Sequence, residues 1–176
     1  YDVYVKNYGN TDVTNVQVTD NLDAINPIPF DVSAVTTTFV SNPAGLVLNP
    51  AFNGTTNTNL LNGTGTLPNF PVSNNSCIIR ITCTLSGIFR GVVYNNSATA
   101  TATGYNSQSL LDVSTDGDLP DLNSNDKPDD VGEDQPTPLL IALTAQTPPC
   151  ASLSNVLITQ NFGTGTGLAN TIPGVV

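Results

Sequence analysis

Apolar and polar residues alternate with a period of two along several short stretches of the chain. Residues 1–8, 13–19 and 77–86 have this pattern, and in the second stretch Val16 and Val18 share one face while polar side chains occupy the other. Such a period places successive side chains on opposite faces of a β-strand. Because no stretch of useful length has a helical period, and turn residues separate the strands at a spacing typical of a β-sandwich, the sequence predicts an all-β fold.

Turn-forming residues join and end these strands. The Asn- and Gly-rich segment 7–10 predicts a hairpin between the first two strands, since both residue types tolerate a positive φ. Further strands are predicted at residues 34–40, 45–48 and 92–104, and a closing strand at residues 139–144. The chain therefore contains enough strands for one good core.

The long segment 49–75 is rich in Asn, Gly, Thr and Pro and has a few apolar anchors. It is predicted to be an ordered loop with one short strand. Its side chains are also suited to hydrogen bonding with sugars, and Phe52 and Phe70 are its aromatic platforms. The anchors are Leu60, Leu61 and Leu67.

Small residues line up in the predicted strand 92–104, where Ala98, Ala100 and Ala102 alternate with threonines. The alanines predict a tightly packed sheet face. The opposing threonine row resembles an ice-binding ladder, but a single row of this kind is usually a solvated strand face.

Proline and glycine suggest how the chain divides. Residues 1–145 are predicted to form the folded repeat, and the Pro148–Pro149 pair marks the boundary segment and start of a following module at residues 146–176. The chain lacks Met and begins inside an alternating stretch, so we interpret it as part of a longer protein. No apolar run of about 18 residues occurs, and no membrane span is predicted.

Charge and composition narrow the possible functions. The net charge is -10 with only four basic residues, which argues against binding to nucleic acid and favours cations as partners. The absence of His leaves no base to activate a serine, and the carboxylates are bunched in one segment instead of facing each other across a cleft. We therefore expect no enzyme activity.

The three cysteines do not form an obvious disulfide. Cys77 and Cys83 belong to one predicted strand, which separates their Cα atoms by about 20 Å, whereas a disulfide requires less than about 7 Å. Both lie on the same face, so we expect two small buried apolar residues. The pairing of Cys150 stays open.

Acidic residues are concentrated in residues 112–134, which contain nine of the fourteen acids and one lysine. Such a segment either stays solvated or binds a hard cation. The spacing of two between Asp121, Asn123 and Asn125 allows their oxygens to converge as in calcium loops, with Asp129 at the ninth position. The sixth position is Asp126, where a regular EF-hand loop has Gly.

We therefore predict calcium as the cofactor of this segment, with a solvated acidic loop as the alternative. Zinc and copper are disfavoured because His and clustered Cys are lacking. The candidate ligands are Asp112, Asp116, Asp118, Asp121, Asn123, Asn125, Asp129, Asp130 and Glu133.

Four stretches together resemble the DUF11-type repeats of large Bacteroidetes cell-surface adhesins and gliding-associated surface proteins. They are VYVKNYGNTDVTNVQVTDNL at residues 3–22, FNGTTNTNLLNGTGTL at 52–67, YNNSATATATG at 94–104 and DVSTDGDLPDLNSNDKPDDVGEDQPTP at 112–138. The resemblance implies an immunoglobulin-like β-sandwich in a tandem array outside the cell, and it implies that the repeat's first strand precedes Tyr1.

Three functional hypotheses follow. The leading one is a stalk repeat of a secreted adhesin, in contact with neighbouring repeats of the same chain and stiffened by calcium in residues 112–134. The second is an adhesive module that binds glycans or surfaces through residues 49–75. The third is a subunit of an extracellular filament that exchanges strands with other copies, because an incomplete sandwich leaves a strand edge open.

Overall fold

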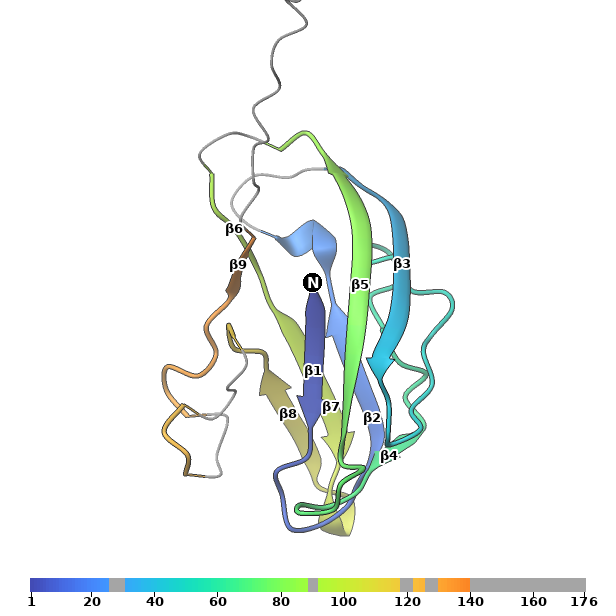
Figure 1. Ribbon diagram of the computed structural model, residues 1–176, viewed down its shortest axis with the longest axis vertical. Helices are drawn as coiled ribbons and strands as arrows, with labels where there is room; N and C mark the ends of the chain where they lie inside the picture. The colour runs from blue at the N-terminus through green and yellow to red at the C-terminus, as the bar shows by residue number, and fades with distance from the viewer. Residues whose placement is uncertain (26–30, 89–91, 118–121, 126–129, 140–176) are drawn as a thin grey trace, which may run out of the picture. The chain divides into compact units, whose positions relative to one another are not determined.

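The computed structural model describes residues 1–25, 31–88, 92–117, 122–125 and 130–139 (Figure 1). Strands dominate these residues, and the helices are two single 3-10 turns, η1 (Leu22–Ala24) and η2 (Tyr105–Ser107). The strands are β1 (Asp2–Lys6), β2 (Val13–Asp20), β3 (Asp31–Ser41), β4 (Gly65–Leu67), β5 (Ser76–Ser86), β6 (Tyr94–Asn96), β7 (Ala98–Thr103), β8 (Ser109–Val113) and β9 (Thr137–Leu139).

All strand pairs in the described part of the chain are antiparallel. One sheet has the order β1-β5-β3, a second has the order β4-β2-β7-β8, and β6 pairs with β9 in a third. The prediction of an all-β fold is confirmed.

The first two sheets share one hydrophobic core. Cys77 and Ile79 of β5 are fully buried, and Val16 and Val18 of β2 belong to the same cluster. The faces predicted from the alternation are therefore confirmed for both strands. Burial of these side chains supplies the main driving force for folding, about 2 kcal/mol for each large aliphatic residue.

The predicted hairpin between the first two strands is wrong, because β1 pairs with β5 whereas β2 pairs with β4 and β7. The segment after β1 crosses from one sheet to the other. The side chain of Asn7 holds this crossing: its Nδ2 donates to the carbonyl oxygens of Thr11, Leu67 and Pro68 at 2.9, 3.1 and 3.1 Å. The bond to Thr11 is local, whereas those to Leu67 and Pro68 tie the crossing to a segment about 60 residues away.

The loop at residues 49–75 is ordered and contains the short strand β4, as predicted. Its anchors Leu60, Leu61 and Leu67 are buried in the common core. The predicted strand at 45–48 is wrong: a turn at residues 43–44 precedes it, Gly45 has φ 71°, and the segment makes only a single bridge, between Leu48 and Leu61.

The predicted strand at 92–104 is divided into β6 and β7, which belong to different sheets. The backbone N–H of Ala98 donates to Ser114 Oγ at 2.9 Å, so the ladder with β8 begins there. The predicted tight packing of the alanine row is confirmed for Ala98, which belongs to the core, whereas Ala100 and Ala102 are partly buried against the core and line a groove.

The observed strand β9 shares only Leu139 with the predicted closing strand, whose remaining residues, 140–144, lie outside the described residues. So do Cys150 and the predicted boundary segment 146–176. Cys77 is buried and Cys83 half-buried, and both are free thiols. Burial raises the pKa of Cys77 to about 12, so this thiol stays protonated, as expected of an apolar core residue.

Candidate functional site

The acidic segment follows β8 and ends before β9. Asp118, Asp121 and Asp129 lie outside the described residues. The structure describes the other six candidate ligands, which are Asp112, Asp116, Asn123, Asn125, Asp130 and Glu133.

The first of these, Asp112, belongs to β8, and the second, Asp116, lies beyond the end of this strand. Asp112 is half-buried in register with Ala100 of β7, and Ser114 closes this ladder by donating its backbone N–H to the carbonyl of Ala98 at 2.9 Å. Asp116 follows in an exposed bend, where Gly117 adopts φ 92°.

Glu133 lies at the centre of the second group. Its side chain is only 3% exposed, and its Oε1 accepts hydrogen bonds from the backbone N–H groups of Leu122 and Asn123 at 2.8 and 3.3 Å. A turn brings it into place, since the N–H of Glu133 donates to the carbonyl of Asp130 at 3.0 Å and Gly132 adopts φ 99°. One carboxylate thus ties residues 122–123 to the turn before β9.

A second carboxylate makes the same connection. Asp130 Oδ2 accepts from Asn125 Nδ2 at 2.6 Å and from Asn123 Nδ2 at 3.4 Å, while Asn123 Oδ1 accepts the backbone N–H of Asn125 at 3.0 Å. Asn123 and Asn125 thus lie together, but their amide nitrogens converge on Asp130, whereas the spacing predicts that their oxygens converge. These amides donate to Asp130, so each must rotate to turn its oxygen toward a cation.

The remaining oxygen of Glu133 is buried as well. Among the described residues, Glu133 Oε2 has no hydrogen-bond partner. A buried carboxylate oxygen without a partner is costly unless a cation or a proton neutralises it. Oxygen donors from carboxylates and amides are the ligands that calcium prefers.

The donor chemistry at Glu133 therefore fits a hard cation, although the described residues give only part of a coordination shell. Nowhere in the described ranges do three or more His, Cys, Asp or Glu residues gather as a metal site would require. Four acids of the segment, among them Asp121 and Asp129, lie outside those ranges.

A further buried carboxylate, that of Asp20, lies outside the acidic segment and is not among the predicted site residues. Asp20, the last residue of β2, is 1% exposed, and its Oδ2 accepts from the Tyr1 hydroxyl at 2.7 Å and from Asn96 Nδ2 at 3.1 Å. Its Oδ1 is buried without a hydrogen-bond partner. The alternation was a usable signal, since Asp20 has the same parity as the buried residues Val16 and Val18.

Burial raises the pKa of Asp20, although hydrogen bonds from Tyr1 and Asn96 act in the opposite direction. Burial also raises the pKa of the Tyr1 hydroxyl, and the charge of Asp20 adds to this effect. The folded state therefore favours the protonated form of Asp20.

Asp20→Asn is expected to stabilise the domain at neutral pH and to have a smaller effect in acid. Because the pKa of Asp20 is higher in the folded state, its stabilising contribution is present below the unfolded pKa and is lost as pH rises through the folded pKa. Urea unfolding at a series of pH values measures the difference. Asp23→Asn, at an exposed position, should not change the pH dependence; an equal change in both variants would contradict the assignment.

The proposed aromatic platforms of residues 49–75 are not both accessible. Phe52 is 7% exposed and belongs to the core, whereas Phe70 is 48% exposed. The Lys6 amine lies 5.5 Å from the Phe70 ring centroid and 4.3 Å from that of Tyr8. In residues 49–75, Phe70 is thus the one exposed aromatic ring that a sugar could contact, and the Lys6 side chain already lies near it.

Comparison with family models, with curated proteins and with solved structures found no match to this chain. Within the described ranges, no helix has the length and apolar character needed to cross a membrane.

Proposed function

We propose that this chain is a structural repeat of a large secreted adhesin on a bacterial cell surface, with an immunoglobulin-like β-sandwich fold and calcium bound in residues 112–134. Two antiparallel sheets with one shared core support the fold. The resemblance to DUF11-type repeats supports the extracellular surface and the contacts with neighbouring repeats.

The observation that carries the calcium proposal is the buried Oε2 of Glu133, which has no hydrogen-bond partner among the described residues. A calcium ion held there by Glu133 and Asp130, with Asn123 and Asn125 as further oxygen donors, would neutralise both carboxylates. Their charge otherwise has to be accommodated by backbone and amide donors alone.

The mechanical consequence depends on where the segment lies. It connects β8 to β9, and β9 pairs with β6 through Tyr94, Asn95 and Asn96. Calcium would fix the chain just before this pairing and so stiffen the end of the repeat. A rigid repeat of this kind spaces an adhesive tip from the cell.

Thermal unfolding with calcium and with a chelator tests the proposal. At a calcium concentration about 100 times the Kd, binding stabilises the folded state by about 2.7 kcal/mol, which corresponds to roughly 5–10 °C in Tm. Glu133→Gln keeps the acceptor for the N–H groups of Leu122 and Asn123 but removes the charge. This variant should lose most of the calcium-dependent shift and should be at least as stable as the wild type in chelator.

Asp31→Asn is the matched control, because it removes one carboxylate from an exposed position outside the segment and should keep the full shift. Equal melting temperatures of the wild-type protein with calcium and with chelator would overturn the calcium proposal. A loss of stability of Glu133→Gln in chelator alone would instead assign Glu133 a purely structural role.

A further inference from the structure

Each of the two main sheets has an edge strand that borders a groove. β1 is the edge of the three-stranded sheet, and β8 is the edge of the four-stranded sheet. A groove of about 570 Å³ lies between them. Its apolar lining includes Val3, Val5, Ala98, Ala100, Ala102 and Leu110.

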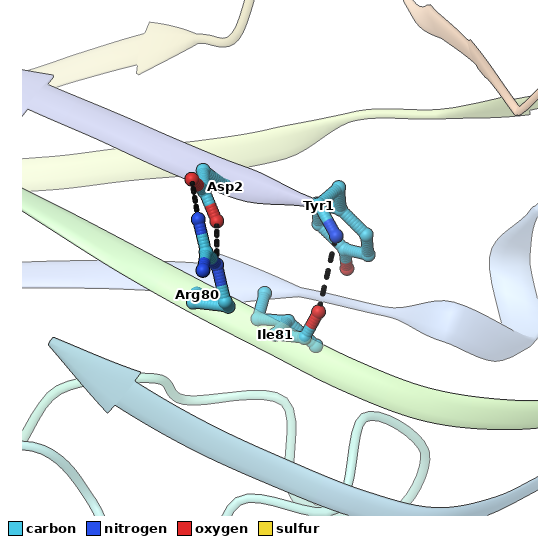
Figure 2. Close-up of polar contacts among 4 residues, drawn as sticks. All are labelled: Tyr1, Asp2, Arg80 and Ile81. Atoms are coloured by element: carbon cyan, nitrogen blue, oxygen red, sulfur yellow. Dashed lines mark hydrogen bonds and ion pairs between the residues drawn. The ribbon is translucent and has the colours of Figure 1, made fainter. Parts of the chain in front are cut away.

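The backbone of β1 is bonded on one edge only. Figure 2 shows the Tyr1 amino group donating to the Ile81 carbonyl at 3.1 Å, and the Ile81 N–H donates back to the Tyr1 carbonyl at 2.9 Å. In an antiparallel pair such bonds recur at every second residue, so the N–H and C=O groups of Asp2, Tyr4 and Lys6 face away from β5. In the described part of the chain no strand pairs with this edge.

The strand β1 is nevertheless held firmly in place. Arg80 of β5 makes two hydrogen bonds of 2.7 Å to the carboxylate of Asp2 (Figure 2), and at the other end the Asn7 N–H donates to the Asn75 carbonyl at 3.0 Å. The open edge is therefore a fixed template for one more antiparallel or parallel strand.

The lining of the groove indicates which side chains the added strand should have. This lining combines the small side chains of Ala98, Ala100 and Ala102 with larger aliphatic ones, so the volume of about 570 Å³ suits apolar side chains on the incoming strand. An uncharged strand also avoids repulsion by a chain whose net charge is -10. The occupant should therefore be extended, uncharged and apolar on one face.

The part of the chain that follows β9 has this composition. Residues 140–176 contain no Asp, Glu, Lys or Arg. Within them, residues 140–146 read LIALTAQ, and in an extended conformation Ile141, Leu143 and Ala145 share one face. This segment begins directly after Leu139, whose position is fixed by pairing with Tyr94.

We propose that the groove beside β1 accepts residues 140–146 of a second copy of this chain as an added β-strand. A second copy is favoured because the segment contains no Gly, Pro, Asn, Asp or Ser with which to reverse direction after β9. Each copy then offers one groove and one donor strand, so the contact is head-to-tail and propagates into a filament. This inference does not depend on calcium.

Sedimentation velocity of the full chain at increasing concentration tests the proposal. The wild type should form species of two or more copies. Tyr4→Pro removes an outward N–H of β1 and should block the groove, whereas Leu143→Lys should disable the donor strand. Each variant alone should be monomeric, and a 1:1 mixture should give a complex of two copies and no larger species.

Leu157→Lys is the matched control, because it adds the same charge to the same uncharged tail and should oligomerise like the wild type. If Tyr4→Pro does not fold, a synthetic peptide of residues 139–146 gives a second measurement, since it should reduce wild-type oligomers to monomers. A wild type that stays monomeric at every concentration, or variants that oligomerise unchanged, would overturn the proposal.

Discussion

Asn7→Ala is expected to destabilise the domain by about 3 kcal/mol. The Asn7 side chain is buried, its two amide N–H groups are shared among the carbonyls of Thr11, Leu67 and Pro68, and each hydrogen bond contributes about 1 kcal/mol net. Its Oδ1 also accepts the N–H of Gly9 at 2.9 Å. Alanine leaves these groups without partners where the chain crosses between the sheets. Urea unfolding monitored by circular dichroism measures the loss.

Asn10→Ala is the control for this change, because Asn10 is an exposed asparagine of the same turn. Its expected effect is within about 0.5 kcal/mol. Equal effects of the two substitutions would show that the Asn7 bonds do not hold the crossing.

Gly54→Ala is expected to cost about 3 kcal/mol for two separable reasons. Gly54 has φ 73°, a conformation that costs an alanine about 1 kcal/mol. A Cβ at this position would also overlap the Leu22 side chain, which is fully buried, and overpacking of this kind costs about 2 kcal/mol. The carbonyl of Gly54 accepts the N–H of Leu22 at 2.6 Å, so the loop has little freedom to move away.

Gly45→Ala separates the two contributions. Gly45 has nearly the same φ, 71°, but a Cβ there would meet nothing within 4 Å. Its substitution should therefore cost only the conformational part, about 1 kcal/mol. Chemical unfolding of the two variants side by side gives the difference, and equal losses would mean that Leu22 does not resist the added methyl group.

The strands and their buried faces could be predicted from the sequence because alternation is a local property. The burial of Ile79 and Val18 follows directly from it. The pairing of strands is not local: the chain crosses between sheets at Asn7 because of bonds to carbonyls about 60 residues away, such as that of Leu67. From the sequence alone, residues 7–10 are only a turn-forming segment, and such a segment predicts a hairpin.

The same contrast between local and non-local features holds for the candidate site. The spacing of Asn123 and Asn125 predicted that their oxygens converge, whereas in the structure it is their amide nitrogens that contact Asp130. The burial of Glu133 could not be predicted, because it depends on a turn at Gly132 that folds one part of the segment onto another. A charged residue in an acidic run gives no local signal of burial, since most such residues are solvated.

The pairing of β1 with β5 also bears on the rate of folding. Asp2 pairs with Arg80, and in the other main sheet Thr14 of β2 pairs with Thr103 of β7, so each sheet needs contacts between residues about 80 or more positions apart. Closing such long loops is entropically costly, and domains with mostly non-local pairs fold on the scale of milliseconds to seconds. We therefore expect slow folding from a domain whose individual strands are short and simple in pattern.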